Sequence, residues 1–286
     1  RYFVPKACSA ETLAGLSRLR VETTMQRITK RSHLQVQRDV IYALLLQELT
    51  SRFGKSRGGF MWVLVEPIAH LLVPMFIFGY IRQALLPGVE YPVFLVYGFL
   101  PFLFFKSICL QMVKGVNSAQ GLLNYRQVQL MDVFIAKAMA YAVIQAVVFA
   151  IVLTGLAIFG YDGLPARPVE FAAVLALTIT LAFGLGLVFA AIASLVPDAQ
   201  SVIQVMFMPL YFASGILFPV TRFADEWVRW LAYNPVLHLV ELTRAMALDG
   251  YEPMKYVSIT YPVVLALTST AIGLMFYRLR FIARVT

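Results

Sequence analysis

The chain has 286 residues, of which 60% are hydrophobic and only 14% are charged. This composition excludes an ordinary soluble domain and indicates an all-α, polytopic membrane protein. The formal net charge of +9 fits contact with an anionic membrane leaflet better than binding of nucleic acid, because the sequence has no separate basic domain that could hold a duplex.

The chain begins with a basic segment, residues 1–32, that lacks the apolar stretch of a signal peptide, and we predict a loosely ordered or weakly helical cytoplasmic tail. Residues 33–53 follow as a predicted helix. Leu34, Ile41, Leu45 and Leu49 share one face of it, so we expect it to lie in the plane of the membrane surface.

The next stretch, RFGKSRGG at 52–59, contains the GKS that ends many phosphate-binding loops. A true loop needs a glycine five residues before Gly54 and a preceding strand, whereas this chain has Leu49 there and a predicted helix. We therefore interpret the stretch as a basic turn at the membrane entrance, and we predict that the chain itself binds no nucleotide.

Six apolar segments are long enough, or nearly long enough, to cross a membrane. They cover residues 60–80, 92–112, 133–159, 171–195, 202–218 and 257–277. Between the second and third, 115–131 is polar and is predicted to be a cytoplasmic loop. Residues 219–252 contain two short helical stretches, 223–233 and 235–248, which are too polar to span. With Trp227 and Trp230 as boundary anchors, we expect this region to enter the membrane from outside and return.

Lys and Arg gather before the first span, in the loop after the second span and in the C-terminal tail. The positive-inside rule therefore places both termini in the cytoplasm, as an even number of spans requires. The two cysteines are Cys8 in the tail and Cys109 inside a span, so we predict no disulfide and no metal site.

Few residues suggest chemistry inside the membrane. Glu66 and His70 share one face of the first span and could form a proton or substrate site, but a structural contact with a neighbouring helix is the favoured interpretation. Ser214 and His238 could form a protease pair, but Phe212 stands where a nucleophile elbow has glycine. We therefore predict that the chain is not an enzyme.

A transport path is the other candidate site, because flat aromatic rings can pack on the CH groups of a sliding sugar. The candidate path residues are Tyr97, Phe104, Phe105, Tyr211 and Phe212, with Arg38 and Lys106 as cations for an anionic cargo. The alternative for most of these rings is simple packing within the bundle or contact with lipid.

Three separated motifs resemble one known family. The entry stretch at 52–57 with Gly59, Trp62, Glu66 and Pro67 resembles that of type-2 ABC exporter permeases of capsular polysaccharide export. Residues 117–132 resemble the family's first cytoplasmic loop. The fifth-span and re-entrant signature is similar in Pro209–Phe212, Ser214–Ile216, Phe218, Pro219, Asn234, Pro235, His238, Val240–Leu242 and Arg244. The N-terminal tail is longer than is usual in this family.

The resemblance implies a homodimer in the inner membrane that works with two copies of a separate ATPase subunit. The partner would bind ATP and Mg, so this chain would need no cofactor. The cargo would be a lipid-linked acidic capsular polysaccharide, passed on to periplasmic and outer-membrane export proteins. Other glycans (O-antigen, teichoic acid), a hydrophobic drug, or an ATP-independent carrier or channel remain as alternatives.

The resemblance also implies roles for particular residues. Those expected to couple the ATPase to the membrane are Glu48, Arg52, Phe53, Lys55, Gln120, Tyr125 and Arg126. Those expected to form the re-entrant gate are Asn234, Pro235, His238, Glu241 and Arg244.

Overall fold

A computed structural model describes residues 32–53, 65, 68–77, 90–119, 121–122, 127–196 and 198–279. Its described regular structure is helical throughout, as the composition predicts. In chain order the elements are α2 (His33–Phe53), a helix at Ile68–Ile77, α4 (Tyr91–Ala119), α5 (Leu130–Ile158), α6 (Pro168–Leu195), α7 (Ala199–Ala213), the short 3₁₀ turn η1 (Val220–Arg222), α8 (Asp225–Leu231), α9 (Pro235–Ala247) and α10 (Thr260–Tyr277).

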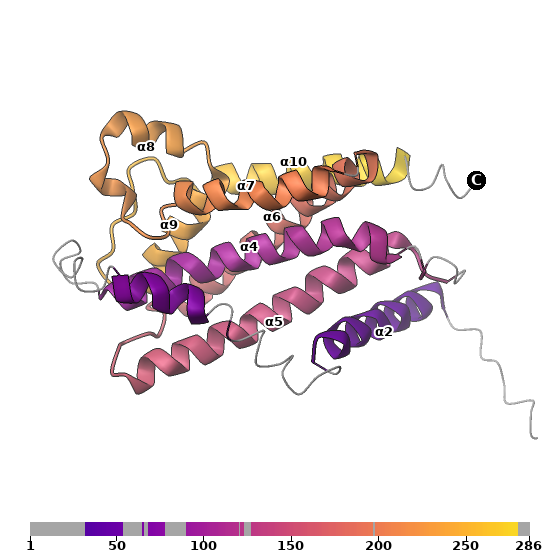
Figure 1. The fold of residues 1–286 in the computed structure, drawn as a ribbon, viewed down its shortest axis with the longest axis horizontal. Coiled ribbons are helices and arrows are strands. Elements are labelled where there is room, and N and C mark those ends of the chain that lie inside the picture. The colour runs from indigo at the N-terminus through magenta and orange to yellow at the C-terminus, as the bar shows by residue number, and fades with distance from the viewer. Residues whose placement is uncertain are drawn as a thin grey trace, which may run out of the picture.

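The helices form an elongated bundle around α4 (Figure 1). Helix α4 contacts α5, α6, α7 and α9, and α6 also packs along α10. Helix α2 lies against α5 near the end of the bundle where the C-terminus emerges, whereas α8 and α9 lie at the opposite end (Figure 1). Helix α2, which carries the predicted coupling residues Glu48 and Arg52, and α9, which carries the predicted gate residues from Pro235 to Arg244, therefore lie at opposite ends of the bundle.

Small residues allow the long helices to approach closely, as is usual between membrane helices. A Cβ added at Gly184 of α6 would lie 2.5 Å from the Ser269 hydroxyl of α10. A Cβ at Gly186 would lie 2.6 Å from the sulfur of Met112 in α4. Helix α6 therefore uses neighbouring glycines to pack against two helices at once.

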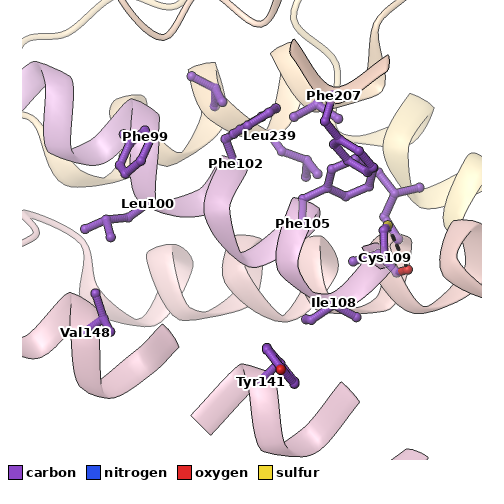
Figure 2. Close-up of a cluster of buried hydrophobic side chains, with 14 of the residues drawn as sticks. Phe99, Leu100, Phe102, Phe105, Ile108, Cys109, Tyr141, Val148, Phe207 and Leu239 are labelled. Atoms are coloured by element: carbon purple, nitrogen blue, oxygen red, sulfur yellow. Dashed lines mark hydrogen bonds between the residues drawn. The ribbon is translucent and has the colours of Figure 1, made fainter. Parts of the chain in front are cut away.

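Aromatic and aliphatic side chains of α4 fill the centre of the bundle (Figure 2). Phe105 packs against Phe207 of α7 with ring centroids 6.0 Å apart, and Ile108 lies on the side of α4 facing Tyr141 of α5. The Cys109 thiol is fully buried and donates a hydrogen bond to the Ala182 carbonyl, 3.3 Å away. This cysteine is a packing residue.

Several helix boundaries in the structure differ from those predicted from the sequence. Helix α4 continues through Ala119, so the expected loop at 115–131 begins five residues too early. Helix α7 ends at Ala213, although the apolar segment runs to 218, because the chain turns at Gly215 with φ +63°. At 15 residues, α7 is about 22 Å long and shorter than the hydrocarbon core. Leu34, placed on the apolar face of α2, is 77% exposed.

Four described helices are long and apolar enough to cross a membrane, namely α4, α5, α6 and α10. The first predicted span, 60–80, is described only at Val65 and at 68–77, so it lies largely outside the described residues. The prediction of six spans therefore remains a prediction, while the polytopic helical class is confirmed.

Candidate functional site

The most tightly bonded polar cluster lies around Arg244 of α9. Its side chain is fully buried and donates hydrogen bonds to the carbonyls of Phe94 at 3.3 Å, Gly215 at 2.9 Å and Ile216 at 2.8 Å. The guanidinium carbon also lies 3.6 Å from the centroid of the Phe94 ring. One side chain therefore joins α9, α4 and the turn that ends α7.

Glu241 completes this cluster as the counter-ion. Its carboxylate accepts a hydrogen bond from Arg244 Nη1 at 3.2 Å and is also fully buried. The Tyr251 hydroxyl donates at 3.0 Å and the Met254 amide donates at 3.2 Å. Burial raises the pKa of the Tyr251 phenol above its ordinary range. Such a saturated pair avoids the cost of an uncompensated buried charge.

The start of α9 is held by Asn234, and Pro235 occupies the first turn, where its missing N–H is tolerated. The Asn234 side chain accepts a hydrogen bond from the Val236 amide at 2.9 Å and donates to the Ser214 hydroxyl at 3.0 Å. Asn234 therefore caps the N-terminus of α9 and also links this helix to the end of α7. Four of the predicted gate residues (Asn234, His238, Glu241, Arg244) contribute hydrogen bonds to this part of the fold.

His238 is held in one tautomer. Its Nδ1 accepts from the Ser258 amide at 3.1 Å, so Nε2 carries the proton and donates to the Ala232 carbonyl at 2.7 Å. Ser214 donates instead to the Leu210 carbonyl at 2.6 Å. The two side chains are thus engaged with other groups and do not form the nucleophile–base pair that a serine protease requires.

A second polar region joins α2 to α5. Lys137 of α5 is buried within its apolar helix, and its ammonium lies 2.9 Å from Glu48 of α2. The Gln37 amide donates to the buried Asp132 carboxylate at 3.2 Å. The Arg52 guanidinium lies 4.8 Å from the centre of the Tyr141 ring. Three side-chain contacts therefore join α2 to α5.

Beside this contact lies a pocket of about 280 Å³, open to the surface. Gln47 and Glu48 of α2, Ser118 of α4 and Lys137 of α5 provide its polar lining. Of the other predicted coupling residues, Lys55, Gln120, Tyr125 and Arg126, together with the Phe53 side chain, lie outside the described part of the chain. Their roles stay predictions.

The predicted path residues do not form one surface in the described chain. Tyr97, Phe104 and Phe105 are buried, and the Tyr97 hydroxyl donates to the Gly163 carbonyl at 2.7 Å. These three therefore occupy packing positions. Lys106 and Tyr211 are half-buried. The two exposed members lie on different helices, Phe212 on α7 and Arg38 on α2.

The predicted pair of Glu66 and His70 in the first span stays a prediction, because Glu66 lies outside the described residues. His70 stacks on the Phe99 ring of α4 with centroids 5.9 Å apart. The described residues contain no group of three His, Cys, Asp or Glu that could hold a metal ion.

Sequence reasoning missed Lys137 and Tyr251, which pair with two of the predicted site residues. A lysine inside an apolar stretch was the available signal for Lys137, because a buried cation in a span needs a partner. No comparable signal identifies Tyr251, whose position against Glu241 follows from the loop after α9.

The described residues thus form a polytopic helical bundle with buried polar clusters at both ends, an architecture that occurs among membrane transporters. Residues 39–248 match the family described as "ABC-2 type transporter", and the chain belongs to this family.

The chain is also similar to individual proteins of known role. The chain is 36% identical over 256 residues to the polysialic acid transport protein KpsM of Escherichia coli, a match that covers 90% of this chain and 99% of that protein. It is 26% identical over 227 residues to the capsule polysaccharide export inner-membrane protein CtrC of Neisseria meningitidis, covering 77% and 84%. It is also 25% identical over 216 residues to the O-antigen export system permease protein RfbA of Myxococcus xanthus, covering 73% and 80%.

Proposed function

We propose that this chain is the permease subunit of an ATP-driven exporter that moves a lipid-linked acidic capsular polysaccharide across the bacterial inner membrane. The observation that carries the proposal is the similarity to the polysialic acid transport protein, which extends over 99% of that protein. The proposed working unit is a homodimer with two copies of an ATPase subunit, which bind ATP and Mg. Both termini are placed in the cytoplasm on the basis of the Lys and Arg distribution.

In this proposal, ATPase closure pushes on α2, and α2 moves α5. The Glu48–Lys137 ion pair and the Gln37–Asp132 hydrogen bond support this route, because each joins the two helices through a side chain that is buried on α5. Arg52 adds a cation–π contact to the same helix. Periplasmic and outer-membrane export proteins would then receive the polymer beyond α8 and α9.

The test is a deletion strain, with and without the gene restored, in which acidic polysaccharide is quantified inside and outside the cells. Polymer trapped inside and released on complementation is the expected result. Deletion of the neighbouring ATPase gene should give the same trapped polymer. Unchanged surface polymer in the permease deletion would refute the proposed cargo, and export without the ATPase would instead identify an ATP-independent carrier.

A second candidate cargo is O-antigen, because the chain also resembles an O-antigen export permease over 73% of its length. Composition analysis of the trapped polymer separates the two. Uronic or sialic acids indicate an acidic capsule, whereas lipopolysaccharide that lacks its O-chain at the surface would indicate the O-antigen route.

A further inference from the structure

Helix α8 lies beside α9 at the end of the bundle opposite α2, and it packs on a small core of its own (Figure 1). Four buried side chains make up this small core: Val220, Val228 of α8, Leu237 of α9 and Met254 of the loop after α9. A helix of 7 residues is too short to be stable by itself in water. The helical state of α8 therefore depends on contacts with other parts of the chain.

Residues 254–258, which we call the strap, provide two of these contacts. At the start of α8, the Tyr256 hydroxyl donates a hydrogen bond to the Asp225 carboxylate, whose oxygens lie 2.8 and 3.0 Å away. In the middle of α8, Val228 shares the small core with Met254 of the strap. The strap therefore holds both the first turn of α8 and its buried face.

The strap and the end of α8 are in turn fastened to the neighbouring helices. The Ser258 amide donates a hydrogen bond to Nδ1 of His238 in α9 at 3.1 Å, and the Val257 amide is hydrogen-bonded within the strap. Just past α8, the Tyr233 carbonyl accepts a hydrogen bond from the Tyr261 hydroxyl of α10 at 2.8 Å. These bonds close α8 and the strap over α9.

Helix α9 itself is held more strongly than α8. Its Arg244–Glu241 pair is fully buried and bonds to α4, to the turn after α7 and to Tyr251. The bond between Tyr256 and Asp225, in contrast, lies at an exposed position. Breaking a buried charge pair is costly, whereas water replaces an exposed hydrogen bond with little loss. Local opening should therefore begin at α8 and the strap, not at α9.

We propose that α8 and the strap form one lid over α9, which opens and closes as a unit while α9 stays fixed to the bundle. Opening separates Val228 and Met254 from Leu237 and breaks the bonds at both ends of α8. In this arrangement the predicted gate residues, which lie at or within α9, belong to the fixed frame, and α8 is the moving part. The inference concerns a motion of the chain itself and holds whatever the cargo is.

The test is hydrogen–deuterium exchange of the full chain in lipid nanodiscs, read in α8, in the strap and in α9. Tyr256→Phe keeps the ring and removes the hydroxyl that bonds to Asp225. Amides of α8 and of the strap should exchange about fivefold faster, because one hydrogen bond that closes the lid is lost. Exchange in α9 should not change. The control is Glu252→Gln, at an exposed position beside the strap, which should exchange as the wild type does.

Tyr261→Phe tests whether α8 and the strap open together. The substitution removes the hydroxyl that bonds to the Tyr233 carbonyl but keeps the ring, whose centroid lies 5.2 Å from that of His238. Tyr261 belongs to neither α8 nor the strap. A lid that opens as a unit should therefore show the same acceleration of exchange in both segments. Acceleration confined to the end of α8 would show that this helix frays alone.

Three outcomes would overturn the lid: wild-type exchange in both segments for either variant, acceleration of α8 without the strap, or equal acceleration of α9. The first would mean that these bonds do not hold the lid closed, the second that there is no common unit, and the third that α9 is not a fixed frame. None of these measurements involves export. The deletion-strain experiment therefore tests the proposed function separately, whatever the exchange data show.

Discussion

Replacing Arg244 by methionine should be among the most damaging single changes at the α9 end of the bundle. Methionine fills a similar volume but removes every donor. The Glu241 carboxylate would keep its contacts with Tyr251 and the Met254 amide but would lose its counter-ion. The carbonyls of Gly215 and Ile216 would lose the donors that hold the turn after α7.

The magnitude follows from these losses. Removing one partner of a buried ion pair costs about 3–5 kcal/mol, and each buried carbonyl left without a donor costs about 1–3 kcal/mol. The contributions overlap, because the turn can move to let water reach the carbonyls. We therefore expect the free energy of unfolding to fall by at least about 4 kcal/mol.

The assay is thermal or denaturant unfolding of the purified chain in a fixed detergent, with two comparison variants. Arg167→Met removes an exposed partner of Glu170, 3.6 Å away, and should change stability by less than about 1 kcal/mol. In a double-variant cycle, Glu241→Gln should recover part of the loss caused by Arg244→Met, because the orphaned charge is removed.

Stability of Arg244→Met within about 1 kcal/mol of the wild type would refute the reasoning. It would mean that the buried pair contributes no more than an exposed one does. A loss of similar size for Arg167→Met would point to a general effect of arginine removal instead.

Three further changes test the packing and the two ends of the bundle. Gly184→Ala places a methyl 2.5 Å from a side-chain oxygen of α10 and should destabilise the protein by about 2 kcal/mol in thermal unfolding. The control is Gly155→Ala, which has nothing within 4 Å of its Cβ and should be neutral or slightly stabilising. Equal effects of the two substitutions would contradict the close approach of α6 and α10. Glu48→Gln leaves the buried Lys137 ammonium without its carboxylate and should speed hydrogen exchange in α2, with α10 as the unaffected reference; unchanged exchange in α2 would rule out the ion pair as its anchor. Asn234→Ala removes the N-cap of α9 and should lower stability by about 1 kcal/mol, and an unaffected melting temperature would show that the cap is replaced by solvent.

Much of the fold could be predicted because hydropathy and helical period are local properties of a sequence. The predicted helix at 33–53 coincides with α2, and the predicted spans at 133–159 and 171–195 differ from α5 and α6 by at most three residues at either end. The end of α4 was missed because Asn117 and Ser118 read as a loop, whereas polar residues are compatible with a helix that projects beyond the apolar layer.

The contacts within the candidate site could be predicted from the sequence less well than the fold. Resemblance assigned Glu241 and Arg244 to one region, but nothing in the spacing indicated that Arg244 reaches the carbonyls of α4 and of the turn after α7. Aromatic rings were assigned to a path by their chemistry alone, and the structure places Tyr97 and Phe105 in packing positions.

The sequence by itself determined the membrane class, the position of most helices and the family motifs, because each depends on residues close together in the chain. Only the tertiary structure decided which polar groups meet. Glu48 pairs with Lys137 across 89 positions of the sequence, and Arg244 bonds to the Phe94 carbonyl across 150. In a low-dielectric interior the energy of a charge depends on partners within a few ångströms, and the folded chain alone brings those partners together.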